Sequence, residues 1–288
     1  YKINKMNDSL VSIVIPNYNR ANLIGETLDS IIQQTYENWE CIIVDDCSTD
    51  DSLQLIEGIT KGDPRIKIFL NNNNQGVGFT KKRCIELATG DICAFVDPDD
   101  AITSDALEIM TKAHIENPET SLVYSNYIKC DESLLEKSIH KNIAVESFRM
   151  DFYNLENEIS HFATFKKKNY NKSSGLNPSY KRVDDQDLYL TLYETGAVHY
   201  INHNLYKYRI HSEGISTFDN IDKAYYWHWH VVIDHADKRG ENVENLFFNY
   251  LERRSKYLQL ERKLELLKKS KWLKLGAKLG VLKNFKYL

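Results

Sequence analysis

The chain has 288 residues, 42% of them hydrophobic, enough to build one large or two small domains around a sizeable core. Its net charge of −4 gives no general attraction to nucleic acid, and no apolar run approaches the roughly 18 residues of a membrane span. The five cysteines form no CxxC pair and no secretory signal opens the sequence, so we expect a cytoplasmic protein with reduced thiols and no nucleic-acid partner.

Short apolar strands alternate with helices over residues 11–96. Strands are predicted over 11–16, 41–44, 65–70 and 92–96. Helices with apolar residues at helical spacing are predicted over about 23–32, 52–60 and 80–88. This alternation implies a parallel sheet with helices on both faces, and ligands of such sheets bind beyond the carboxyl ends of the strands.

Polar clusters follow each of these strands. After 92–96, Asp97, Asp99 and Asp100 place three carboxylates within four residues, which suits a site where Mg²⁺ or Mn²⁺ neutralises them. An Asp-rich turn that caps the next helix is the alternative. The other clusters lie at 17–20, at Asp45 and Asp46, and in the Asn-rich loop 71–78. A nucleotide-binding crevice is therefore predicted, and the absence of G-x-G-x-x-G and P-loop patterns argues against a dinucleotide fold or a P-loop.

The ordered motifs resemble those of the family 2 glycosyltransferases. The resemblance covers about residues 11–211 and is carried by VSIVIPNYNR, SIIQQTYENWECIIVDDCSTDDS, NQGVG and ATGDICAFVDPDD. It implies an α/β fold of the GT-A type, a Rossmann-like mixed sheet flanked by helices. It also implies an inverting enzyme that uses a nucleotide-diphosphate sugar, with a UDP-sugar favoured, and a divalent cation, Mn²⁺ or Mg²⁺.

The resemblance further implies roles for individual side chains of the donor site. Asp46 is expected at the nucleobase, Asp97 at the ribose, and Asp99 and Asp100 at the metal, with the assignment among these three open by one position. The donor-binding set is Pro16, Tyr18, Asn19, Arg20, Asp46, Gly76, Lys81, Asp97 and Asp99.

One departure from the family pattern concerns Lys81 and Lys82, which stand where the family often carries Arg-Asn. A lysine can meet a phosphate or base only as a point charge, without the bidentate fork of arginine. The alternative for these lysines is a solvated basic face of the helix.

A second acidic cluster, Asp184, Asp185 and Asp187, opens a predicted helix, where the helix dipole alone would favour it. The family has a Glu-Asp-x-Asp/Glu-Leu motif at this point, and the resemblance implies that Asp185 is the catalytic base, with Asp184 in place of Glu. LYKYRIHS is similar to the family's Y-R-x-H segment, which implies His211 as a metal ligand or diphosphate contact. His161 is either part of the acceptor pocket or an ordinary hydrogen-bonded histidine.

We expect a catalytic domain over 1–218, with a donor half of about 10–100 and an acceptor half of about 101–218, and a helical region over 219–288. The aromatic run YYWHWH at 225–230 is interpreted as a packing patch rather than a zinc site. Residues 253–288 carry a net charge of +10 with leucines along one side, which predicts a helix that binds an anionic membrane surface. Packing on its own domain or on a homodimer partner is the alternative.

We expect a single sugar addition to a hydroxyl of a glycan or lipid-linked acceptor in cell-envelope polysaccharide synthesis, at the inner face of the plasma membrane. Processive synthases add membrane spans and a Q-x-x-R-W motif, neither of which occurs in this sequence. A sugar nucleotidyltransferase is disfavoured, because such enzymes have a Gly-rich, Arg-containing loop after the first strand and this chain has NYNR there. The remaining alternative is a catalytically inactive scaffold that binds a nucleotide-sugar or glycan at the membrane.

Overall fold

The computed structural model describes residues 9–145, 148–212, 214 and 220–269. Close contacts divide the chain into two compact units, with the boundary between His235 and Ala236. Helix α8 (Ile221–Lys238) crosses this boundary, and helix α9 (Val243–Lys269) belongs to the second unit. The first part of α8 groups with the first unit. The domain boundary that we expect at residue 218 stays a prediction.

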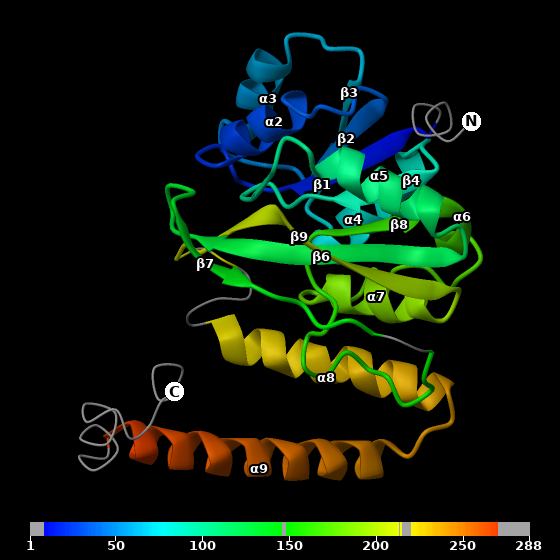
Figure 1. Ribbon diagram of the computed structural model, residues 1–288. Helices are drawn as coiled ribbons and strands as arrows, with labels where there is room; N and C mark the ends of the chain where they lie inside the picture. The colour runs from blue at the N-terminus through cyan, green and yellow to red at the C-terminus, as the bar shows by residue number, and fades with distance from the viewer. Residues whose placement is uncertain (1–8, 146–147, 213, 215–219, 270–288) are drawn as a thin grey trace. The chain divides into compact units, whose positions relative to one another are not determined.

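The first half of the first unit has the predicted alternation of strands and helices (Figure 1). In chain order its elements are β1 (Val11–Asn17), α2 (Ile24–Ile32), β2 (Trp39–Asp45), α3 (Ser52–Thr60), β3 (Ile66–Leu70), α4 (Val77–Leu87) and β4 (Ile92–Phe95). β1 pairs in parallel with β2 and β4, and β2 pairs in parallel with β3. The predicted parallel sheet is therefore confirmed for this half.

The second half adds antiparallel strands and makes the sheet mixed. Its elements are β5 (Ala101–Ile102), α5 (Ala106–Glu116), β6 (Thr120–Cys130), β7 (Glu136–His140), β8 (Ala163–Lys166), α6 (Lys167–Tyr170), α7 (Asp184–Tyr193) and β9 (Ala197–Arg209). Across the described residues the strand order is β3-β2-β1-β4-β8-β6-β9-β5, with β7 paired to β6. Because β8 is antiparallel to both β4 and β6, it joins the two halves in one continuous sheet.

Helices cover both faces of this sheet. Alternate residues of β1, such as Ile13, pack with Leu28 of α2 and Leu107 of α5 in the main hydrophobic core. The intervening Val14 is also buried, and α4 packs against β1 and β2. Since side chains of a strand point alternately to the two faces, a β1 that is buried throughout must be covered on both. The predicted mixed sheet flanked by helices is thus confirmed.

His161 lies just before β8 and stacks on Tyr206 of β9, with 4.8 Å between the ring centroids. The tail helix begins earlier than residue 253, and the predicted helix beyond Lys269 lies outside the described residues. No helix in the described part of the chain is long and apolar enough to cross a membrane.

Candidate active site

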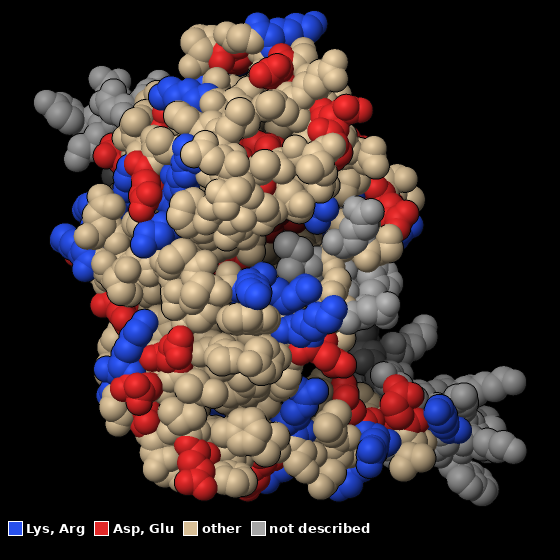
Figure 2. Space-filling view, turned by 180° about the vertical axis from the view of Figure 1, so that it is seen from behind, with Lys and Arg blue, Asp and Glu red and all other residues tan. Residues whose placement is uncertain are grey.

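A cavity of about 840 Å³ opens where β1, β2 and β4 end. Figure 2 shows one face of the molecule, on which Lys and Arg side chains gather beside a hollow. Most of the predicted site residues line this cavity: Pro16, Tyr18, Arg20, Asp46, Gly76, Lys81, Asp97, Asp99, Asp100, Asp185 and His211. The structure therefore brings the donor carboxylates, which follow β2 and β4, together with the polar residues after β1 and the acidic start of α7.

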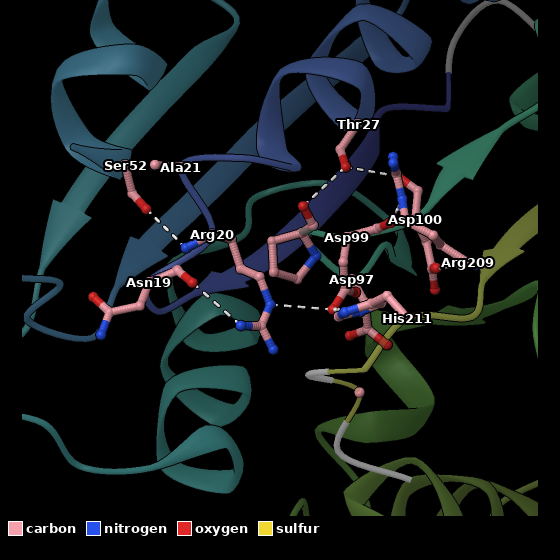
Figure 3. Close-up of polar contacts among 12 residues, drawn as sticks. Asn19, Arg20, Ala21, Thr27, Ser52, Asp97, Asp99, Asp100, Arg209 and His211 are labelled. Atoms are coloured by element: carbon pink, nitrogen blue, oxygen red, sulfur yellow. Dashed lines mark hydrogen bonds and ion pairs between the residues drawn. The ribbon is translucent and has the colours of Figure 1, made fainter. Parts of the chain in front are cut away.

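Asp99 contacts two basic side chains, those of Arg20 and His211 (Figure 3). Its Oδ2 lies 3.1 Å from Nε of Arg20 and 3.1 Å from Nε2 of His211. Burial alone would raise the pKa of Asp99, but the hydrogen bond from His211 and the charge of Arg20 outweigh it and lower the pKa. The cluster thus keeps an ionised carboxylate at the cavity wall.

Asp100, which was predicted to bind the metal, also lines the cavity. Its carboxylate is buried, and Oδ1 accepts the backbone N–H of Arg209 at 2.7 Å. Burial, with Asp99 and Asp97 nearby, raises the pKa of Asp100 well above its usual value. The Thr27 hydroxyl donates to the Asp100 carbonyl at 2.6 Å, as Figure 3 shows. These contacts favour a role for Asp100 in fixing the turn after β4 rather than in binding a metal.

Arg209 braces the same turn from β9. Its Nε donates to the Asp99 carbonyl at 2.6 Å, its guanidinium forms an ion pair with Glu26 of α2, and its Nη1 donates to the Glu132 carbonyl. The Arg209 side chain is only 1% exposed. The Y-R-x-H segment therefore holds the acidic turn through its arginine and reaches Asp99 through its histidine.

Asp46 fastens the loop that precedes α4. Its Oδ1 accepts hydrogen bonds from Asn71 Nδ2 and the Gln75 backbone, and Oδ2 accepts the Gly76 N–H at 2.8 Å. A carboxylate has about four acceptor positions, so one stays available on Oδ2. Asp46 can therefore both fix this loop and accept an N–H of a nucleobase.

Asn19 was predicted to bind the donor, but it does not line the cavity. Its backbone has a left-handed conformation with φ of 49°, which asparagine tolerates better than most residues. Its Oδ1 accepts the N–H of Thr49 at 2.8 Å, so the side chain braces the loop after β2. Asn19 still supports the site indirectly, because its carbonyl accepts a hydrogen bond from Arg20.

The three carboxylates at the start of α7 differ in their surroundings. Asp187 is buried against His235, with 2.9 Å between Oδ1 and Nε2, and also accepts the Asn177 N–H. Asp184 is buried and forms an ion pair with Lys81. Asp185, with a side chain 34% exposed, lines the cavity and lies 3.9 Å from Nε2 of His161. Of the three, Asp185 is therefore the one placed to meet a substrate.

Lys81 is buried, with 5% exposure, so the solvated helix face considered as an alternative is wrong for this residue. Its Nζ lies 2.8 Å from Asp184 Oδ2 and 3.3 Å from Asp97 Oδ1. Burial would lower the pKa of Lys81, but Asp184, Asp97 and Asp185 raise it well above its usual value. A positive charge thus joins the acidic turn after β4 to the start of α7.

Asp99 and His211 both line the cavity, and a divalent cation bound there would replace the hydrogen bond of 3.1 Å between Asp99 Oδ2 and His211 Nε2. Within the described residues, no group of three or more His, Cys, Asp or Glu side chains is arranged to hold a metal ion. Mg²⁺ commonly takes one or two protein ligands and completes its shell with phosphate oxygens and water. The two side chains suit that kind of site.

Several lining residues were not predicted. They come from the segment before α7, from β9 and from α8, and they are Lys181, Arg182, Tyr208, Tyr226 and Trp227. The sequence signal for the last two was the aromatic run at 225–230, which was interpreted as packing. A local sequence pattern could not place this aromatic run at the cavity, because it does not show how α8 packs on the rest of the first unit's residues.

The fold and the rim of carboxylates define an α/β domain of the GT-A type. A family model described as glycosyl transferase family 2 matches residues 12–173, and the chain accordingly belongs to that family. The Bacillus subtilis (strain 168) protein TuaG, named as a glycosyltransferase of teichuronic acid biosynthesis, is 31% identical over 72% of this chain and 82% of its own length. The "Chondroitin synthase" of Escherichia coli is 28% identical over 80% of this chain, which spans only 33% of that protein.

Solved structures share the fold at low sequence identity. Staphylococcus aureus TarS 1–349 in complex with UDP-GlcNAc has a TM-score of 0.64 at 18% identity, over 82% of this chain and 69% of that one. The mannosyltransferase PcManGT from Pyrobaculum calidifontis, in complex with GDP-Man and Mn²⁺, has a TM-score of 0.60 at 18% identity. It covers 96% of this chain and 81% of its own. The expected GT-A fold is thus confirmed.

Proposed function

We propose that the chain transfers one sugar, with inversion at the anomeric carbon, from a nucleotide-diphosphate donor to a hydroxyl of a glycan or lipid-linked acceptor in cell-envelope polysaccharide synthesis. The observation that supports this most is that Asp185 lines the same cavity as Asp46, Asp97 and Asp99. A base and a donor-binding rim that share one cavity can bring two substrates together. The intact acidic groups do not favour an inactive binding scaffold.

In this proposal the Asp185 carboxylate accepts the proton of the acceptor hydroxyl as that oxygen forms its bond to C1 of the sugar. The bond between C1 and the diphosphate oxygen breaks on the opposite face, and its electron pair leaves with the nucleoside diphosphate. His161, 3.9 Å from Asp185, limits the positions open to that carboxylate. Attack and departure on opposite faces invert the configuration.

The donor would lie along the acidic rim, with its base at Asp46 and its ribose at Asp97. A UDP-sugar is the donor we favour, as TarS 1–349 binds UDP-GlcNAc and an Escherichia coli relative is named as a UDP-Glc-dependent glucosyltransferase. We assign the metal to Asp99 and His211, with Asp100 as a supporting residue. A cation held there, Mn²⁺ or Mg²⁺, would supply positive charge for the leaving diphosphate.

The test is the variant Asp185→Asn, which keeps the size of the side chain and removes its basicity. We expect sugar transfer to fall by about 10²–10⁴-fold, while binding of UDP in the presence of Mn²⁺ stays near the wild-type value. A screen of UDP-sugars for Mn²⁺-dependent release of UDP would first identify the donor. Asp51→Asn, an exposed acidic residue at the start of α3, is the matched control. Undiminished transfer by Asp185→Asn would overturn the assignment.

A further inference from the structure

Two aromatic side chains of α8 extend the cavity beyond the groups used so far. Tyr226 and Trp227 line the same space as Asp185 and His161. Tyr226 is 60% exposed, and Trp227 is half-buried. A large aromatic side chain in the core of a protein is buried, whereas these two are open to the cavity. Contact with a ligand therefore explains their position better than core packing does.

Neighbouring rings support both side chains. Trp227 contacts Tyr180 at 6.2 Å between ring centroids and His230 at 5.3 Å. Tyr180 is buried, and its hydroxyl donates a hydrogen bond to Asp234, further along α8. Tyr226 contacts His230 at 4.6 Å, and its hydroxyl lies 2.7 Å from Nε2 of that histidine. The two rings are therefore held in place before any ligand binds, which lowers the entropic cost of binding.

The helix that carries these rings is joined to the helix that carries the base. His235 of α8 lies 2.9 Å from Asp187 and 3.3 Å from Glu194. Asp187 follows Asp185 by two positions on α7, and its carboxylate is almost fully buried in this contact. The aromatic pair and Asp185 thus belong to one arrangement of two linked helices.

We propose that Tyr226 and Trp227 form a stacking platform for a pyranose ring of the acceptor. This proposal rests on the proposed function and assigns its acceptor subsite. One face of a pyranose presents C–H groups of slight positive charge, which pack on the negative face of an aromatic ring. Lys181, Asp222 and Lys223 line the same cavity and supply polar partners for the hydroxyls at the edge of the sugar.

Saturation-transfer NMR tests the platform with defined probes. These are the methyl β-pyranosides of glucose, galactose and N-acetylglucosamine, which have no aromatic aglycone, each added with and without UDP and Mn²⁺. We expect at least one to receive saturation from the wild-type protein, and the signal to fall about five-fold or more in Trp227→Ala and Tyr226→Ala. Trp229→Ala, on the same helix but outside the cavity lining, is the matched control and should keep the signal.

Two results would overturn the platform: no saturation of any of the three pyranosides by the wild-type protein, or signals that persist in both Ala variants. Tyr226→Ala keeps the test valid if Trp227→Ala does not fold, because Tyr226 is mostly exposed. Binding of UDP with Mn²⁺ is measured separately in each variant. Its failure in the wild-type protein would count against the proposed function, whereas the pyranoside signals alone decide on the platform.

Discussion

Nζ of Lys81 lies 2.8 Å from Oδ2 of Asp184, and both side chains are about 6% exposed. The same nitrogen lies 3.3 Å from Asp97, at the end of the strand that delivers the acidic turn. Lys81 therefore joins two segments that are far apart in sequence. In one of them, the proposed base Asp185 directly follows Asp184. This buried cation thus links the donor rim to the segment that carries the proposed base.

Replacement of Lys81 by Met should destabilise the protein and reduce transfer together. Removal of one partner from a buried ion pair leaves an uncompensated charge and costs about 3–5 kcal/mol. Chemical denaturation measures the loss of unfolding free energy, and Lys82→Met, at the half-exposed neighbouring position, is the control. The double variant Lys81→Met/Asp184→Asn should recover part of the stability, because the orphaned carboxylate is gone. Wild-type stability in Lys81→Met would contradict this account.

Asp99 and Asp100 should respond differently to replacement by Asn. Asp99→Asn removes a charge that faces Arg20 and His211, so we expect UDP binding to lose its dependence on Mn²⁺. Asp100→Asn retains an oxygen that can accept the Arg209 N–H, so metal-dependent binding and stability should change little. Calorimetric titration with UDP, with and without Mn²⁺, separates the two variants. Equal losses in both would argue against our assignment of Asp99 and His211 as the metal ligands.

The donor half of the fold could be predicted because its signals are local. Each apolar run and each helical repeat lies within about ten residues, and the βαβ order then determines how the strands pair. The second half could not be predicted in the same way. The pairing of β8 with both β4 and β6 depends on contacts between residues such as Ala94 and Thr164, for which no short-range pattern exists.

The site was predicted as a set of motifs, but the sequence could not assign each side chain. Asp184, Asp185 and Asp187 are chemically alike, and in the sequence only the family resemblance singled out Asp185; the burial and the partners of each carboxylate came from the structure. Asn19 belongs to a predicted motif, yet a left-handed backbone turns its side chain to Thr49. Trp227 lines the cavity because the first part of α8 packs within the first unit, and no local sequence pattern shows that packing.

Residues of α9 should bind anionic membranes if the basic C-terminal region acts as we predict. The exposed basic residues of its described part are Arg253, Arg254, Lys256, Arg262, Lys263 and Lys269. Each cation near an anionic surface contributes about 1 kcal/mol, so replacement of the six by Gln should abolish co-sedimentation with phosphatidylglycerol vesicles at low salt. Neutral phosphatidylcholine vesicles and six exposed Lys→Gln changes in the first unit serve as controls. Vesicle binding that survives the six changes in α9, or a dimer instead of vesicle binding, would refute the membrane prediction.

His235 should make the stability of the first unit depend on pH. Burial would lower the pKa of His235, but its hydrogen bonds to Asp187 and Glu194 outweigh burial and raise the pKa above the ordinary 6.5. A raised pKa in the folded state means that the stabilisation is complete below pH 6.5 and is lost as the pH rises through the folded-state value. His235→Gln should therefore remove a decrease in unfolding free energy that wild type shows above pH 6.5.

His203→Gln, at an exposed position of β9, is the control and should retain that decrease. Denaturant unfolding at a series of pH values measures both, and a parallel pH profile for wild type and His235→Gln would show that the contact with Asp187 does not depend on a charged imidazole.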